Sequence, residues 1–221
     1  MEDPATHWDY LHQNPRFRPS YPSEPVVRFM MGNRKALEKG SGARFLDIGV
    51  GAGRHAKFSA DLAFAPFGID ISLVGLQHAR EQLRQAGVRA HLAEASMLAL
   101  PFKNGSFEVA LSYGVFYYGT AAEMKRAIDE TYRVLSPGGR AFIVVRTTSD
   151  CRFGKGQQIE SNTFRLTMTE TNEEGTVQHF LAADDIPKYF SQFSRVTFEK
   201  SETTFANRRF INSDWLITLE K

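Results

Sequence analysis

The chain has 221 residues, of which 42% are hydrophobic and 24% charged, an ordinary composition for a globular protein. Its 27 Lys and Arg residues nearly balance 25 Asp and Glu residues, and the net charge of +2 argues against a nucleic-acid binder. The single cysteine, Cys151, excludes an internal disulfide framework and a cysteine-rich metal site. No run of 18 apolar residues predicts a membrane span, and the first residues show no signal-peptide pattern, so we expect a cytoplasmic protein.

Residues 1–24 are polar, aromatic and interrupted by proline. Pro15, Pro19 and Pro22 exclude a long helix, although a turn or two could form before them. We expect an ordered arm that lies over the body of the protein, because its aromatic side chains need a surface to pack on. These side chains are Trp8, Tyr10, Phe17 and Tyr21.

From residue 44 onward, short apolar runs alternate with amphipathic stretches. The apolar runs predict strands at 45–48, 67–70, 88–93, 107–113 and 141–145. The amphipathic stretches predict helices at 54–64, 72–86 and 121–135, after a first helix that begins near Ser23, carries Leu37 on its apolar side and ends at Gly40. Four alternations within about 100 residues favour a parallel sheet with helices on both faces.

The pattern changes after residue 146. Residues 147–162 are polar and irregular, and alternating apolar residues around a turn at 172–175 predict a hairpin over 163–181. A helix at 184–193 and strands at 195–205 and 209–219 complete the predicted elements. The short connection between the last two strands makes them antiparallel neighbours. The sequence thus predicts an α/β fold whose seven-stranded sheet has five parallel strands followed by an antiparallel pair.

The segment LDIGVGAG (46–53) ends a predicted strand and opens a helix. Its glycines let the backbone turn sharply and let a ligand approach the main chain, and the helix N-terminus adds free N–H groups. A dinucleotide site needs the spacing GxGxxG, whereas here the third glycine comes one residue early and Arg54 takes its place. Asp47 would repel a pyrophosphate but suits a ligand with an ammonium group. Asp70 ends the next strand, where a carboxylate can accept both hydroxyls of a ribose.

Four blocks of the sequence together resemble the class I S-adenosylmethionine-dependent methyltransferases, in particular the broad small-molecule subgroup often labelled type 11. The blocks are LDIGVGAG (46–53), GIDIS (68–72), SMLALPFKNGSFEVALSYGVFYY (96–118) and RVLSPGGRAFIVV (133–145). The resemblance covers residues 40–146 well and the two ends loosely. It implies a Rossmann-like fold, S-adenosylmethionine as the cofactor, and direct displacement of its methyl group by an O, N or C atom of a small molecule.

The resemblance also implies roles for individual residues. The methionine part of the cofactor is assigned to Asp47, Gly49, Gly51 and Gly53, and the ribose hydroxyls to Asp70. The adenine is assigned to Ile71, Ser96, Met97 and Leu98, and the sulfonium to Tyr113 and Gly114. Two positions depart from the family pattern. Ser96 stands where an acid is frequent, which weakens the contact to the adenine amino group, and Glu108 replaces the usual aspartate at a structural position.

Further candidates lie outside these blocks. Tyr117 and Tyr118 follow the fourth strand and suit the acceptor side, where aromatic faces stabilise a sulfonium or an amine. His179, on the predicted hairpin, is the candidate for a base or for a group that orients the acceptor, although a lone histidine is more often structural. Arg18 and Tyr21 are candidates to fold over the cofactor carboxylate. His55, His78 and His91 have no evident partners and are expected to be structural. No catalytic side chain is assigned, because methyl transfer from a sulfonium requires mainly alignment.

We expect one domain over residues 1–221. Its parts are an arm (1–24), a cofactor-binding core (40–146), a lid insertion (147–181) and a C-terminal helix with two strands (182–221). The expected partner is a small-molecule acceptor, with no nucleic acid, membrane or metal, and the chain is expected to be a monomer or homodimer. Two alternatives stay open: an NAD(P)-dependent oxidoreductase, which the glycine spacing and Asp47 disfavour, and a cofactor-binding partner protein without catalysis.

Overall fold

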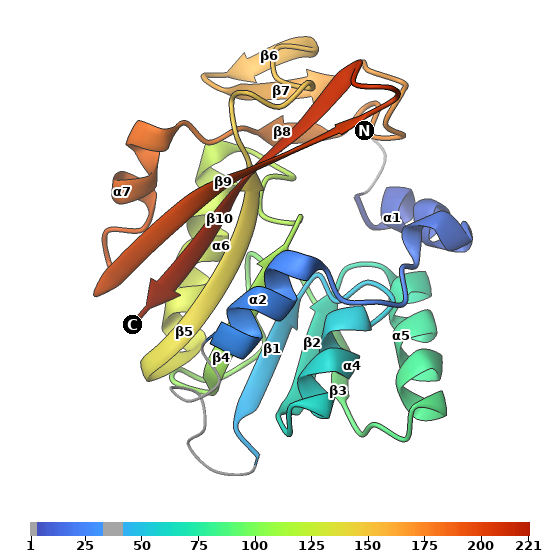
Figure 1. Cartoon of the computed structure of the whole chain (residues 1–221), viewed down its shortest axis with the longest axis vertical. Helices are drawn as coiled ribbons and strands as arrows, with labels where there is room; N and C mark the ends of the chain where they lie inside the picture. The colour runs from blue at the N-terminus through green and yellow to red at the C-terminus, as the bar shows by residue number, and fades with distance from the viewer. Residues whose placement is uncertain (1–3, 33–41) are drawn as a thin grey trace.

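The computed structural model describes residues 4–32 and 42–221. Its main sheet has seven strands in the order β3-β2-β1-β4-β5-β10-β9 (Figure 1). The strands are β1 (Arg44–Ile48), β2 (Ala65–Asp70), β3 (His91–Glu94), β4 (Phe107–Tyr113), β5 (Leu135–Arg146), β9 (Arg195–Phe205) and β10 (Phe210–Glu220). The first five are mutually parallel, and β10 pairs antiparallel with both β5 and β9. The predicted sheet of five parallel strands and an antiparallel pair is confirmed.

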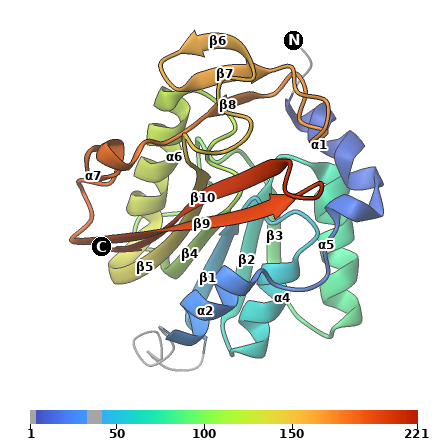
Figure 2. The same ribbon diagram turned by 45° about the horizontal axis from the view of Figure 1, so that its top comes forward.

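Helices cover both faces of this sheet (Figures 1 and 2). They are α2 (Glu24–Gly32), α4 (Arg54–Asp61), α5 (Leu73–Gln85), α6 (Ala121–Val134) and α7 (Ile186–Tyr189). Strand β1 shows why both faces need cover, because its successive side chains point to opposite sides. Phe45 packs in one apolar cluster with Phe29 of α2, and Leu46 packs in another with Ile128 of α6. The continuation of the first helix to Leu37 and Gly40 falls outside the described residues.

The N-terminal arm is more helical than expected. It forms α1 (Pro4–Gln13) and a 3₁₀ turn (Pro15–Phe17), and α1 packs beside α5 (Figure 2). Pro4 occupies the first helical position, where a missing N–H costs nothing. The expectation that the arm's aromatic side chains are packed holds for Trp8 but is wrong for Tyr10 and Tyr21, which are exposed.

A small second sheet stands beyond the carboxyl ends of the main strands, at the top of Figure 1. It consists of β6 (Gly156–Glu160), β7 (Thr163–Leu166) and β8 (Val177–His179), paired in that order and antiparallel. The hairpin predicted over 163–181 is confirmed, whereas β6 was not expected. The helix predicted at 184–193 is shorter than expected, because a 3₁₀ turn (Ala183–Asp185) comes first and α7 ends at Tyr189.

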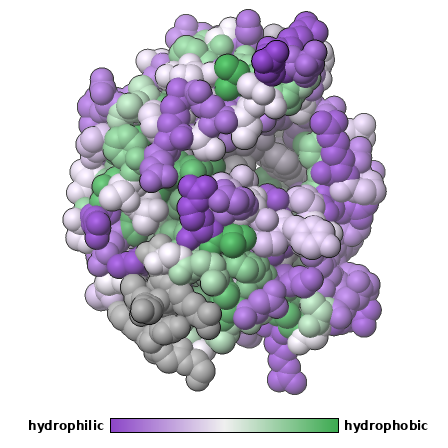
Figure 3. Space-filling view, in the orientation of Figure 1, coloured by the Kyte–Doolittle hydropathy of each residue, from purple (hydrophilic) through white to green (hydrophobic). Residues whose placement is uncertain are grey.

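The face of the molecule drawn in Figure 3 mixes hydrophilic and hydrophobic residues. Large apolar side chains that remain exposed include Met31, Phe198 and Ile211. Phe198 borders a shallow groove between α2 and the β9–β10 pair, where Pro25 and Leu216 also lie. This groove shares no lining residue with the cavity at the carboxyl ends of the strands.

Candidate functional site

A cavity of about 350 Å³ lies at the carboxyl ends of β1, β2 and β4. Open α/β sheets bind their ligands at this edge. Residues of the loops after β1 and β2 that were predicted for a cofactor site and line the cavity are Gly49, Gly51, Asp70 and Ile71. Predicted residues from the segments after β3 and β4 that line it are Ser96, Met97, Leu98, Tyr113 and Gly114. The cavity therefore brings together most of the residues that the sequence blocks suggested.

The loop between β1 and α4 requires glycine at both of its ends. Gly49 has a φ of +79°, and a Cβ added there would lie 2.3 Å from Val115 Cγ2. Gly53, directly before α4, has a φ of +92°, and a Cβ there would lie 3.2 Å from Ala79 Cβ of α5. A side chain at either position would strain the backbone and displace the neighbouring element. Gly53 itself does not line the cavity but lets α4 and α5 approach each other.

Asp70 ends β2 and faces the glycine loop. Its Oδ2 accepts the Gly51 N–H at 2.8 Å, and its Oδ1 accepts the Ser72 N–H at 2.9 Å. Burial raises the pKa of this carboxyl, while the two backbone donors favour its charged form. The carboxylate oxygens keep further lone pairs, so the group can also accept a hydrogen bond from a ligand in the cavity.

Asp47 and the first residues of α4, Arg54 and His55, lie together at one end of the site. Asp47 is fully buried and does not line the cavity; burial raises its pKa to about 8, and Arg54 opposes this shift. Arg54 lines the cavity, with its guanidinium 5.3 Å from the centre of the Tyr113 ring. His55 also lines it, accepts the Ser23 N–H at 3.2 Å, and places Nδ1 4.0 Å from Asp47 Oδ2. Burial and Arg54 lower the pKa of His55 to about 3, so its imidazole is neutral.

The arm closes the cavity from the side opposite the sheet. Asp9 of α1 accepts the Ser72 hydroxyl at 2.7 Å and the Val74 N–H at 3.1 Å, which fixes α1 to the first turn of α5. Trp8 lines the cavity and meets the Tyr118 ring edge to face, with the ring centres 4.8 Å apart. Tyr118, which was predicted for the acceptor side, therefore does line the cavity, together with a tryptophan that sequence reasoning did not select.

The arm reaches the cavity with other residues than those predicted. Arg18 instead contacts α5, where its Nη1 lies 2.9 Å from His78 Nε2, and Tyr21 is 83% exposed. Neither side chain lines the cavity. The residues of the arm that do line it are Pro4, Trp8, His12, Phe17 and Pro19. The docking of α1 on α5 brings Arg18 against His78 of that helix.

His179 and Tyr117 are placed away from the cavity. His179 Nδ1 is bonded to the Thr163 hydroxyl at 2.8 Å and Nε2 to the Tyr189 hydroxyl at 3.0 Å, so both ring nitrogens are satisfied within the protein. Tyr117 is buried with its ring against the Arg146 guanidinium, 4.4 Å from the ring centre. These two residues contribute to the contacts between the small sheet and the rest of the protein. Neither of them lines the cavity.

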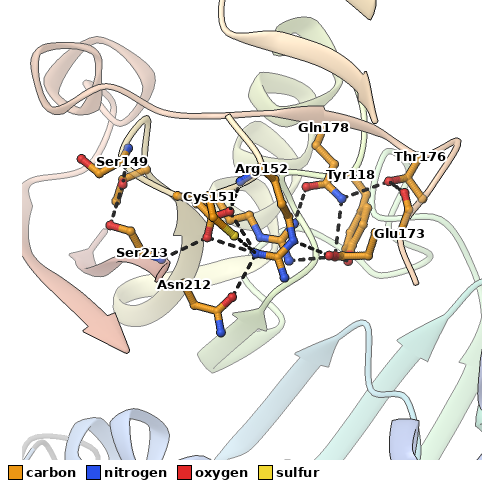
Figure 4. Close-up of polar contacts among 12 residues, drawn as sticks. Tyr118, Ser149, Cys151, Arg152, Glu173, Thr176, Gln178, Asn212 and Ser213 are labelled. Carbon is orange, nitrogen blue, oxygen red and sulfur yellow. Dashed lines mark hydrogen bonds and ion pairs between the residues drawn. The ribbon is translucent and has the colours of Figure 1, made fainter. Parts of the chain in front are cut away.

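A buried ionic network lies behind Tyr118 (Figure 4). Glu173 accepts from Arg146 Nη2 at 2.7 Å, from Arg152 Nε at 2.5 Å and from the Tyr118 hydroxyl at 2.5 Å. Arg152 also donates to Asp150 Oδ1 at 2.9 Å. Burial and the neighbouring Tyr117 and Glu173 raise the pKa of the Tyr118 phenol well above its usual value, so it is a hydrogen-bond donor and no base.

Within residues 4–32 and 42–221, no three His, Cys, Asp or Glu side chains are arranged to hold a metal ion. Over the same residues, no helix is both long and apolar enough to cross a bilayer.

Comparison with known proteins identifies the domain that carries this cavity. Residues 45–139 match a family described as "Methyltransferase domain". A demethylmenaquinone methyltransferase of Thermus thermophilus is 35% identical over 112 residues, 49% of this chain and 49% of that protein. A tRNA (carboxymethyluridine(34)-5-O)-methyltransferase of Mus musculus is 34% identical over 121 residues, 54% of this chain and 16% of that protein. This chain spans about half the length of the first of these relatives and less of the second.

Solved structures give the same fold. A S-adenosylmethionine-dependent methyltransferase of Methanosarcina mazei superposes with a TM-score of 0.70 at 21% identity, covering 82% of this chain and 93% of that chain. Dinucleotide-binding Rossmann sheets have the strand order 3-2-1-4-5-6. Here β10 lies between β5 and β9 and runs antiparallel to both. Residues 45–139 of this chain therefore match a methyltransferase domain, and the chain has the fold of S-adenosylmethionine-dependent methyltransferases of known structure.

Proposed function

We propose that the chain binds S-adenosylmethionine in the cavity at the carboxyl ends of β1, β2 and β4 and transfers its methyl group to a small molecule. The observation that carries this proposal is the placement of two buried carboxyl groups, those of Asp47 and Asp70, at the two sides of one glycine loop. The cavity volume of about 350 Å³ is within the range of small-molecule sites, about 300–1,000 Å³.

The residues present fit the cofactor's charged end. Asp47 Oδ2 is buried and has no hydrogen-bond partner among the described residues. A buried carboxyl oxygen without a hydrogen-bond partner is costly, and the ammonium group of the cofactor's methionine part would supply a charge-assisted bond once the carboxyl releases its proton. Arg54, which lines the cavity beside Tyr113, is the residue we assign to the cofactor carboxylate. The methionine part would lie against Gly49 and Gly51.

The adenosine end is assigned along the other half of the cavity. Asp70 would accept the ribose hydroxyls with the lone pairs that its backbone donors leave free. The side chains we assign to the adenine are Ile71, Met97 and Leu98, with Ser96 at its edge. Ser96 Oγ already accepts the Leu98 N–H at 3.2 Å, so it offers the adenine a weaker acceptor than a carboxylate would.

When bound, the cofactor supplies an activated methyl group, so the protein's contribution is alignment and the exclusion of water. Tyr113, Tyr118 and Trp8 form an aromatic wall suited to this task. The histidines at the cavity do not qualify as strong bases, because burial lowers the pKa of both His12 and His55. We therefore propose a reaction in which positioning, rather than a general base of this chain, provides most of the acceleration.

We propose a small molecule as the acceptor. The cavity is lined largely by apolar and aromatic side chains, and a net charge of +2 is small for a protein that binds a nucleic acid. The name of the Thermus relative refers to a small molecule, and that of the mouse relative refers to a tRNA. This chain covers only 16% of the mouse protein. Residues 147–181, with the small sheet, are proposed to cover the acceptor side.

Two measurements test the proposal. Thermal melting with S-adenosylhomocysteine, the demethylated product, should raise the melting temperature, whereas NAD should leave it unchanged. Stabilisation by NAD alone would favour an oxidoreductase. Incubation with S-adenosylmethionine and a fractionated metabolite extract should then release S-adenosylhomocysteine in a fraction-dependent way, and the Asp70→Ala variant should release less of it at the same cofactor concentration. Binding of the cofactor without turnover in any fraction would favour a non-catalytic partner protein.

A further inference from the structure

His12 stands where the arm meets the rest of the site. It lies near the end of α1, is buried, and lines the cavity. Its ring fits over the first turn of α5, because a Cβ added to Gly75 would lie 2.7 Å from His12 Nδ1. The imidazole therefore depends on a glycine at position 75, and together with Asp9 it ties the arm to α5.

The hydrogen bonds around Ser72 fix which nitrogen of His12 carries the proton. The Ser72 hydroxyl has one hydrogen, and it goes to the Asp9 carboxylate, which can only accept, at 2.7 Å. Ser72 Oγ then accepts the Gly75 N–H at 2.9 Å and, at 2.9 Å, must also accept from His12 Nδ1. His12 is thus the tautomer with its proton on Nδ1. Burial lowers its pKa, so Nε2 is an unprotonated acceptor.

Nε2 points to the part of the cavity that Asp70 also faces. It lies 3.6 Å from the position that a Cβ on Gly51 would occupy, and the N–H of this same Gly51 donates to Asp70 Oδ2 at 2.8 Å. Burial lowers the pKa of His12, and the nearby charge of Asp70 opposes this shift, as expected for close neighbours. A neutral nitrogen acceptor and a carboxylate therefore flank one spot beside the glycine loop.

On the basis of the function proposed above, we propose that His12 Nε2 accepts a hydrogen bond from one ribose hydroxyl of the cofactor, next to Asp70. A ribose offers two hydroxyl donors. A carboxylate together with an imidazole whose tautomer is fixed forms a pair of acceptors, which distinguishes a ribose from a deoxyribose. Because α1 also carries Trp8, this bond would add to the contacts that hold the arm, and with it one wall of the cavity, in place.

The sharpest variant is His12→Asn, because the asparagine amide can replace Nδ1–H as a donor to Ser72 but leaves no acceptor at the position of Nε2. The matched control is His78→Asn, the same change at a histidine of α5 that contacts Arg18 and does not line the cavity. Calorimetry would compare S-adenosylhomocysteine with its 2′-deoxy and 3′-deoxy analogues. Melting curves without ligand would verify that each variant is folded.

For S-adenosylhomocysteine we expect His12→Asn to weaken binding about three- to tenfold, the usual range for one neutral hydrogen bond, and His78→Asn to leave it unchanged. For one of the two deoxy analogues, wild type and His12→Asn should bind equally. His12→Gln, whose amide oxygen reaches the position of Nε2, should recover part of the affinity.

Equal weakening for all three ligands, or no weakening at all, would overturn the role of His12 while leaving the proposed function intact. Failure of the wild-type chain to bind S-adenosylhomocysteine would overturn both.

Discussion

Replacing Glu173 with glutamine keeps the size of the side chain and removes the charge that two buried guanidinium groups share. Burial alone would raise the pKa of Glu173, but Arg146 and Arg152 outweigh it and lower the pKa from the ordinary 4.5 to about 2. At about 1.4 kcal/mol per pKa unit, this shift corresponds to about 3 kcal/mol of folding free energy at neutral pH. Breaking a buried ion pair costs about 3–5 kcal/mol, and we expect the lower end because Asp150 still pairs with Arg152.

Urea denaturation of wild type and Glu173→Gln at two pH values tests this magnitude. Because the folded pKa is depressed, the stabilisation is complete above about pH 4.5 and is lost as the pH falls toward 2. The difference between the two proteins should therefore be about 3 kcal/mol at pH 7 and less than half of that at pH 3. Glu174→Gln, an exposed neighbour on the same loop, should change the stability by less than about 0.5 kcal/mol. A Glu173→Gln effect as small as that of the control, or one independent of pH, would show that the charge of Glu173 does not stabilise the fold.

Three further predictions concern the cavity. Asp70→Ala should weaken binding of S-adenosylhomocysteine by about 1–3 kcal/mol in calorimetry, and an unchanged Kd would mean that the ribose lies elsewhere. Gly49→Ala should lower the melting temperature, because its Cβ would lie 2.3 Å from Val115 Cγ2 at a φ of +79°; melting like wild type would contradict the tight turn. Because burial holds the pKa of Asp47 at about 8, this carboxyl is protonated at pH 7 and should release its proton when an ammonium group binds. The observed binding enthalpy should then differ between buffers of different ionisation enthalpy, and identical enthalpies would exclude such a release.

Local sequence patterns predicted the main sheet well and its additions less well. The strand predicted over 107–113 coincides with β4, because an apolar run bounded by turn residues has few other ways to be buried. The helix predicted at 184–193 is cut short, since the chain leaves α7 at Tyr189 and is extended again from Arg195 to pair along β10. Tertiary pairing there overrides local helical spacing.

Some residues of the candidate site could likewise be predicted from the sequence, and others could not. The glycine loop and Asp70 could be predicted, because the ends of adjacent parallel strands meet whatever the rest of the chain does. His12 could not, since its partner Ser72 is 60 residues away and only the docking of α1 on α5 brings the two together. His55 had a usable signal in its position directly after Arg54 at the start of the helix that follows the glycine loop. Its partner, the Ser23 N–H, has no sequence signature.

The most direct measurement of the central claim is a crystal structure of the chain grown with S-adenosylhomocysteine. We expect the nucleoside in the cavity beneath α1, with the ribose hydroxyls on Asp70 and the amino group facing Asp47. A ligand bound at another surface, or one whose ribose and amino group contact neither carboxylate, would contradict it.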